Sequence, residues 1–124
     1  MNILNMQNNA MTKPLNQNKM EKVIRENKVA VLYSPGFGSG WYTWNSDSEE
    51  LIFNPTLVEM VEQGRREEIT EELCKELLGK ADYVCTLGAR DLSIAWIPVG
   101  TKFTIQEYDG SESIMTVEDL ELTA

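Results

Sequence analysis

A glycine-rich stretch, SPGFGSGW at residues 34–41, contains the residue types best suited to ligand chemistry. Alternate glycines let several backbone N–H groups point at one anion, and a serine between them adds a hydroxyl. The aromatic residues offer flat faces on which a nucleobase can stack. The competing interpretation is a tight turn between two strands, which uses the same residue types. We expect this loop to cradle a phosphate-bearing ligand through Gly36, Phe37, Gly38, Ser39, Gly40 and Trp41.

Arg90 is the most suggestive charged residue outside that loop. It lies in LGARD, residues 87–91, a connection between two predicted strands, and such connections often carry binding groups. Its guanidinium could hold a phosphate through two parallel hydrogen bonds. The alternative is an ion pair with Asp91 or with a helix carboxylate. Arg65 and Arg66 fall in an acid-rich helical segment, where solvated or inter-subunit ion pairs are the expected outcome.

Several catalytic classes are disfavoured by what the chain lacks. It contains no histidine, so an acid–base enzyme would have to use carboxylate, lysine, tyrosine or cysteine groups. The stretch around Ser39 departs from GxSxG because Phe37 replaces the first glycine. It also lacks the last glycine of a dinucleotide fingerprint and the GK[ST] of a Walker loop. We predict no catalytic residue, no cofactor and, since Cys74 and Cys85 stand singly, no metal site.

Composition restricts the partners. The net charge of −9, from 20 acidic and 11 basic residues, repels a phosphate backbone and disfavours long nucleic acids. A small anion remains compatible, because a few N–H groups and one arginine act locally. No apolar run approaches the roughly 20 residues of a membrane span, and the polar start lacks the apolar core of a signal peptide. We expect no membrane association and a cytoplasmic protein with two ordinary, partly buried thiols.

The elements that must position the loop begin with a buried strand in KVAVLYS, residues 28–34, which ends at Pro35. The following WYTWN, residues 41–45, alternates bulky and smaller side chains and predicts a second strand. Core packing is therefore the competing interpretation for Trp44, and also for Trp96 further along the chain. Residues 51–53 predict another short strand.

One long helix is predicted from Asn54 to Gly79. Asn54 is the candidate N-cap with Pro55 in the first turn; alternatively Thr56 is the cap and Glu59 completes a capping box. Such a helix would be roughly 36 Å long, which favours a partner surface. Gly64 either breaks the helix or permits close approach of another backbone, and we favour close approach. The apolar stripe consists of Leu57, Val61, Ile69, Leu73 and Leu77.

The remaining sequence has the period of β-strands. Strands are predicted at 82–86, around the alternating residues 92, 94 and 96, at 101–108 and at 113–117, with Asp109-Gly110 as a hairpin turn. The fold class is therefore α+β, with a small, mainly antiparallel sheet packed against one long helix in a homo-oligomer. We expect a mobile N-terminal arm at 1–20, a single ligand-binding domain at 21–118 and an acidic tail at 119–124.

Three segments together resemble the phage anti-defence proteins that counter the bacterial Thoeris system. They are KVAVLYSPGFGSGWYTWN, LIFNPTLVEMVEQ and DLSIAWIPVGTKFTIQEYDGSESI, and the resemblance extends over about residues 23–115. It implies a molecular sponge that binds glyco-cyclic ADP-ribose without cleaving it, so that the Thoeris effector is not activated. It also implies action in the host cytoplasm, homodimers with ligand pockets at the subunit interface, further assembly into hexamers and, in some members, binding of cyclic trinucleotides.

Under this resemblance, Phe37 and the neighbouring glycines are expected to contact base and phosphate, and Arg90 the pyrophosphate. Asp91 and Asp109 are the candidates for the ribose hydroxyls, because one carboxylate can accept hydrogen bonds from two adjacent OH groups. Two other functions remain open. One is an enzyme that hydrolyses such a nucleotide with carboxylates such as Asp91 or Asp109, and the other is a purely structural phage oligomer.

Overall fold

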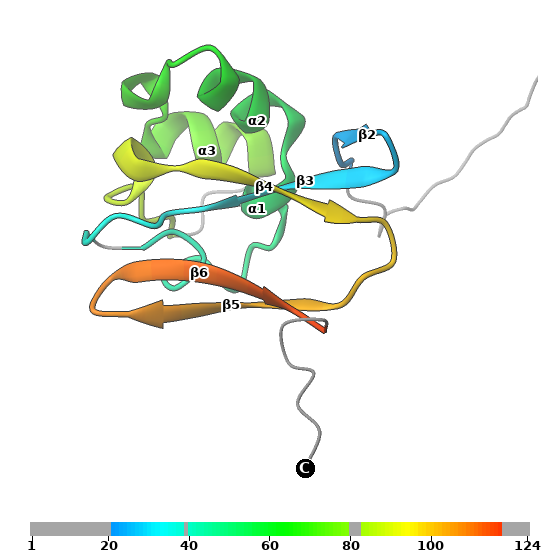
Figure 1. The fold of residues 1–124 in the computed structure, drawn as a ribbon. Coiled ribbons are helices and arrows are strands. Elements are labelled where there is room, and N and C mark those ends of the chain that lie inside the picture. The colour runs from blue at the N-terminus through cyan, green and yellow to red at the C-terminus, as the bar shows by residue number, and fades with distance from the viewer. Residues whose placement is uncertain (1–20, 39, 80–82, 118–124) are drawn as a thin grey trace, which may run out of the picture.

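The computed structural model describes residues 21–38, 40–79 and 83–117; the expected arm at 1–20 and the acidic tail at 119–124 lie outside the described residues. The α+β class is confirmed, but two antiparallel sheets replace the single sheet expected (Figure 1). The three-stranded sheet contains β2 (Ile24–Arg25), β3 (Lys28–Tyr33) and β4 (Ser93–Pro98), in that order. The second sheet is a hairpin of β5 (Phe103–Tyr108) and β6 (Ser111–Thr116).

Strand β3 lies at the centre of the fold, as its apolar sequence predicts. It pairs with β4 along its full length, from Lys28 opposite Pro98 to Tyr33 opposite Ser93. Ala30, Val31 and Leu32 are all completely buried. Because successive side chains of a strand point to opposite faces, this burial shows that both faces of β3 are covered.

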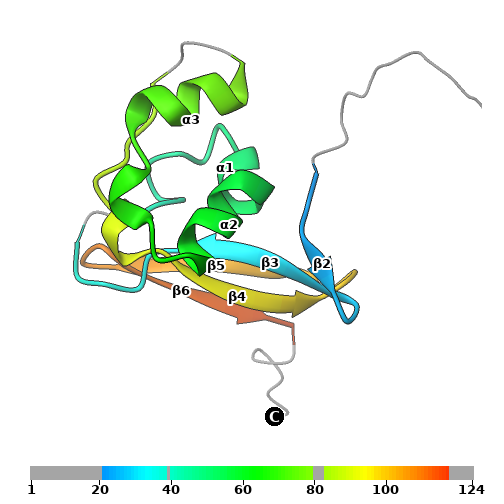
Figure 2. The same ribbon diagram turned by 90° about the horizontal axis from the view of Figure 1, so that it is seen from above.

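Two short helices, α2 (Pro55–Glu62) and α3 (Glu71–Leu78), replace the one long helix. A third, α1 (Glu50–Phe53), precedes them, and Figure 2 shows all three on the same side of the strands. The predicted start is confirmed, since the Asn54 side chain accepts hydrogen bonds from the N–H groups of Thr56 and Leu57 at the beginning of α2. The predicted stop at Gly79 is also confirmed, because Gly79 has a left-handed φ of 69°.

Gly64 explains why the long helix was the wrong prediction. Its φ is +73°, and the Arg65 N–H reaches back to the Met60 carbonyl while the Gly64 N–H reaches Val61. This pair of hydrogen bonds is a Schellman motif, which ends α2. A Cβ on Gly64 would meet no atom within 4 Å, so the expected close backbone approach is wrong as well. A 3₁₀ turn at Arg66–Glu68 then leads to α3, which Thr70 caps.

Three of the predicted strands are not strands. Residues 41–45 form consecutive turns, residues 51–53 belong to α1, and residues 83–86 have no regular structure; residues 80–82 lie outside the described residues. The reason at 83–86 is that a side chain takes the place of a neighbouring strand. The Asn45 amide donates to the Cys85 carbonyl, and the Asn45 side-chain oxygen accepts from the Cys85 N–H, each at 2.9 Å.

The β5–β6 hairpin agrees with its prediction. Asp109 and Gly110 both have positive φ, 53° and 86°, as a two-residue type I′ turn requires. The turn places the alternating Phe103 and Ile105 on the face that packs on the core. In this position the ring of Phe103 meets that of Phe53 from α1 edge-on, with centroids 6.4 Å apart. The hairpin therefore covers the side of β3 away from α2 and α3 (Figure 1).

Cys74, completely buried on α3, provides a test of this core. Burial raises the pKa of its thiol from 9.0 to about 11. Between about pH 9 and 11 the Cys74 thiol therefore stays protonated in the native state but ionises in the unfolded chain. The contribution of the thiol to the free energy of unfolding is complete below about pH 9 and is lost as the pH rises towards 11. Wild type should lose about 2 kcal/mol more than Cys74→Ala between about pH 8 and 11, measured by urea unfolding. Equal losses would contradict the burial.

Candidate functional site

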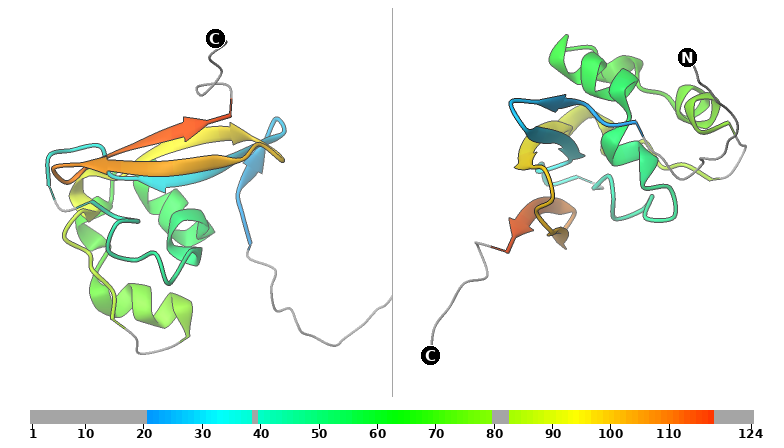
Figure 3. Two further views of the ribbon diagram at one scale, coloured as in Figure 1. Left: turned by 90° about the horizontal axis from the view of Figure 1, so that it is seen from below. Right: turned by 90° about the vertical axis from the view of Figure 1, so that its right-hand side faces the viewer.

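The glycine-rich loop lies against two other turns at one end of the molecule. Figure 1 shows it at the left beside the residues that precede β4 and beside the tip of the β5–β6 hairpin, and the left view of Figure 3 shows the same neighbours. Gly88 is packed so closely that a Cβ there would overlap the Gly40 carbonyl. A Cβ on Gly110 would likewise overlap the Gly38 carbonyl. Glycine is therefore required at these two positions of the turns that receive the loop.

Asp91 belongs to the same cluster. It ends the 3₁₀ turn Ala89–Asp91, and its carboxyl group lies over the loop. A Cβ on Gly36 would be 2.5 Å from the Asp91 carboxyl carbon, and one on Gly38 would be 3.4 Å from its Oδ2. The structure thus brings together Asp91, two loop glycines and the Asp109-Gly110 turn, which come from three separate parts of the sequence. Ser39 lies outside the described residues.

A hollow of about 480 Å³ opens between the loop, the segment after it and the hairpin tip. We call it the loop hollow. Its volume is within the range of small-molecule sites. Two carboxylates, Glu107 and Asp109, line it, and Glu107 also accepts a hydrogen bond of 2.7 Å from the Gly110 N–H. Sequence reasoning missed Glu107. The lining consists of Gly38, Thr43, Trp44, Leu87, Glu107, Asp109 and Gly110.

Two large side chains near the hollow are exposed: Trp44, which lines it, and Phe37, which precedes the lining residue Gly38. Phe37 is 82% exposed and Trp44 58%, so the core-packing interpretation of Trp44 is wrong. Trp41 shows the opposite behaviour: its ring is fully buried and its Nε1–H donates to the Leu51 carbonyl at 3.0 Å. Trp41 is therefore a core residue whose ring faces no ligand in this chain. Leu87, which also lines the hollow, is 75% exposed and adds apolar surface beside the two carboxylates.

Arg90 is exposed in the turn that carries Asp91. Among the described residues, the ion pairs are those of Arg25 with Glu62, Arg65 with Glu68 and Lys75 with Glu71. Among these residues Arg90 forms an ion pair neither with Asp91 nor with a helix carboxylate, which were the alternatives to ligand binding. Its guanidinium is therefore accessible to an anion beside the loop. Arg65 fits its expectation as a surface ion pair, whereas the Arg66 Nε–H donates to the Leu92 carbonyl.

The N–H groups at the two ends of the loop already donate to a carboxylate of the protein itself, that of Glu112. Glu112 on β6 is 1% exposed, and its Oε1 accepts from the Ser34 N–H at 2.9 Å. Its Oε2 accepts from the N–H groups of Trp41 and Thr43 and from the Thr43 hydroxyl, each at 2.8 Å. A ligand phosphate therefore cannot use these amides while Glu112 occupies them.

Sequence reasoning missed Glu112 because the predicted strand began at Ser113. The hairpin turn at Asp109-Gly110 leaves room for the strand to begin at Ser111, where β6 does begin. In that frame Glu112 shares the inward face of Ile114, and a carboxylate at an inward position requires hydrogen-bond donors. The alternation between inward and outward residues was therefore the available signal.

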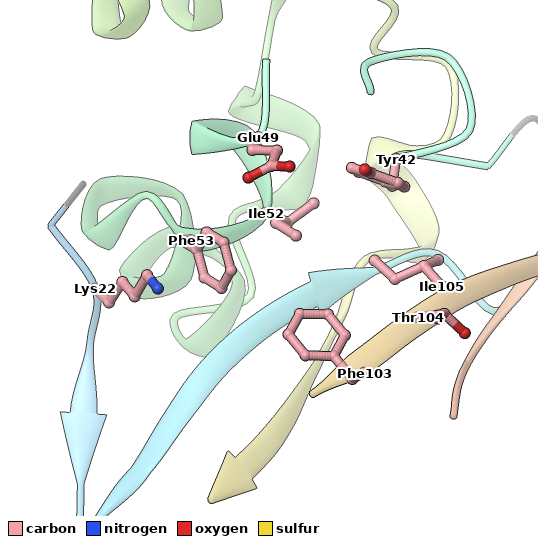
Figure 4. A pocket seen from close by; sticks show the side chains of 8 residues that line it. All are labelled: Lys22, Tyr42, Glu49, Ile52, Phe53, Phe103, Thr104 and Ile105. Carbon is pink, nitrogen blue, oxygen red and sulfur yellow. The ribbon is translucent and has the colours of Figure 1, made fainter. Parts of the chain in front are cut away.

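A second hollow, of about 420 Å³, lies on another part of the surface between α1 and β5. Figure 4 shows the Lys22 ammonium directed at the ring of Phe53, 4.4 Å from its centroid, with Phe103 on the strand below. None of the loop residues lines this hollow. In the described part of the chain, no group of three or more cysteine, aspartate and glutamate side chains is arranged to hold a metal ion.

Comparison of the chain with protein-family models, with curated proteins and with solved structures gave no match. The described residues form a small α+β fold with a hollow beside the glycine-rich loop, and carboxylates and the exposed Trp44 line this hollow. Among residues 21–38, 40–79 and 83–117, no helix combines the length and apolar character needed to cross a membrane.

Proposed function

We propose that this chain is a binding protein that holds glyco-cyclic ADP-ribose uncleaved in the host cytoplasm, and so keeps the Thoeris signal from its effector. The observation that carries the proposal is the loop hollow. There a tightly packed glycine loop, exposed aromatic side chains and carboxylates come from separate parts of the chain. The resemblance of three sequence segments to Thoeris anti-defence proteins supplies the identity of the ligand.

Each part of such a ligand has a chemically suitable partner. An adenine can stack on Phe37 or Trp44, whose faces are exposed, with a gain of about 1 to 3 kcal/mol per base. Ribose hydroxyls are donors, and the carboxylates of Asp109 and Asp91 are acceptors beside the loop. The pyrophosphate belongs next to Arg90, the exposed cation of the same turn. The loop therefore serves to present Phe37 and to bring these groups together.

The charge balance of this site favours a second subunit. Glu107, Asp109 and Asp91 place three carboxylates around the loop, whereas Arg90 is the cation of the adjoining turn. A pyrophosphate needs more positive charge than one chain supplies in this region. A homodimer in which a second copy contributes its own arginines would meet that need, and the exposed apolar side chains would be buried between the copies. We therefore propose a homodimer, with hexamers as a further assembly.

The proposal is tested by identifying the compound that the protein releases after it has bound the nucleotide. Purified protein is incubated with glyco-cyclic ADP-ribose, freed of unbound nucleotide by gel filtration and denatured by heat, and the released compound is identified by mass spectrometry. Intact ligand in stoichiometric amount is the expected result. A hydrolysed product would replace the proposal with the carboxylate enzyme, and absence of any nucleotide would leave the structural oligomer. A parallel incubation with a cyclic trinucleotide tests the second ligand class.

A further inference from the structure

We propose that Glu112 is the positioning residue of the site: its buried carboxylate holds the two ends of the glycine-rich loop so that Phe37 is presented to the ligand. This inference rests on the proposed function for its ligand, but its geometry stands on the hydrogen bonds of the chain alone. Glu112 lies on β6, far from the loop in sequence, and so links the hairpin to the loop.

The bonds made by Glu112 enclose the loop from both sides. Ser34 precedes the loop and Trp41 and Thr43 follow it, and all three direct N–H groups to the two oxygens of this one carboxylate. The Glu112 N–H in turn donates to the Ser34 carbonyl at 2.9 Å. The two ends of the loop are therefore held at a fixed separation by one side chain. Phe37 lies between these two ends in the sequence.

Gly40 shows how closely the loop is fitted to this carboxylate. Its φ is +79°, and a Cβ there would lie 2.9 Å from the Thr43 hydroxyl oxygen and 3.2 Å from Glu112 Oε2. A side chain at this position would therefore enter the space between Thr43 and Glu112. The third glycine of the loop, which the sequence suggested as part of an anion cradle, accommodates an internal anion.

A carboxylate is the only natural side-chain group of this length that accepts hydrogen bonds on both oxygens. In Glu112→Gln, the amide NH₂ must face either the Ser34 N–H or the three donors from Trp41 and Thr43, so at least one donor loses its acceptor. The bonds that remain also lose their charge assistance. We therefore expect the loop to open locally while β3 and the helices stay folded.

The first test needs no ligand. Amide hydrogen exchange is followed by NMR in the wild type, in Glu112→Gln and in Glu72→Gln, a matched change at an exposed glutamate of α3. Exchange at Trp41 and Thr43 should accelerate at least tenfold in Glu112→Gln, with β3 amides still protected. Unchanged exchange at both residues would overturn the inference, whether or not any nucleotide binds.

The second test separates positioning from general stability. Thr43→Val removes one donor to Glu112 from a largely exposed side chain, and Thr104→Val makes the same change on an exposed face of β5. Calorimetry with glyco-cyclic ADP-ribose should show Kd raised about threefold in Thr43→Val and about tenfold in Glu112→Gln. The control variants Thr104→Val and Glu72→Gln should bind with the wild-type Kd. Wild-type Kd in both Thr43→Val and Glu112→Gln would overturn the inference. If the wild type itself binds nothing, the proposed function fails, and the exchange measurement still decides on Glu112.

Discussion

Replacing Gly88 with alanine is expected to destabilise the fold by about 3 kcal/mol and to abolish nucleotide binding. The added Cβ would overlap the backbone carbonyl of Gly40, and a backbone atom cannot turn aside as the end of a flexible side chain can. Gly88 cannot move away easily either. Its carbonyl accepts a 2.9 Å hydrogen bond from the buried Ser34 hydroxyl, and its neighbour Ala89 is buried. Urea unfolding followed by tryptophan fluorescence measures the loss.

Gly38→Ala is the matched control for this prediction. Its Cβ would meet only the Asp91 Oδ2, at 3.4 Å, which is an ordinary contact, and Gly38 is not among the glycines with positive φ. The change should alter stability by less than about 1 kcal/mol, in either direction, because alanine also restricts the unfolded chain. If Gly88→Ala unfolded at the same urea concentration as Gly38→Ala, the close packing of the loop on the 88–91 turn would be wrong.

Phe37→Ala should have the largest effect on binding among the variants that keep the fold intact. Phe37 is 82% exposed, so its truncation removes little core packing and should leave the melting temperature within about 1 °C of the wild type. If adenine stacks on this ring, Kd for glyco-cyclic ADP-ribose should rise about 10- to 100-fold, because base stacking contributes about 1 to 3 kcal/mol. Isothermal titration calorimetry measures the change.

The control for Phe37→Ala is Ile24→Ala. Ile24 is 55% exposed on β2, which pairs with the beginning of β3, whereas the loop follows the end of β3. This change removes exposed apolar surface at a distance from the loop and should leave Kd unaltered. Equal affinities for wild type and Phe37→Ala would show that the ring is no stacking platform, and Trp44 would then be the remaining aromatic candidate of the loop hollow.

Together the two variants distinguish the base of the loop from its tip. The base is fixed by backbone packing on Gly88 and by the Glu112 carboxylate, so changes there act on folding and binding at once. The tip carries an exposed ring, so a change there acts on binding alone. This division suits the proposed binding function, because a preformed site loses little conformational freedom when a ligand binds.

Local chemistry explains which elements could be predicted. The β3 strand, the Asn54 cap, the Gly79 stop and the Asp109-Gly110 turn were correct because each depends on residues within a few positions of one another. The prediction of one long helix was wrong because the apolar residues kept a period of four on both sides of Gly64. That period gives no sign of the Schellman motif, which ends α2 at Gly64. The run at 51–53 failed since a short apolar segment suits a strand or a helix equally.

By itself the sequence determined the α+β class, the buried central strand and the presence of a glycine-rich loop that carries an aromatic residue. Only the tertiary structure decided what that loop contacts. Partners such as Gly88, Gly110 and Glu112 are distant along the chain, and hydrogen bonds and packing form between groups that the fold brings together, whatever their separation in sequence. For the same reason only the fold could show that the amides around the loop hold Glu112, and that the ring free to meet a ligand is that of Phe37 and not of Trp41.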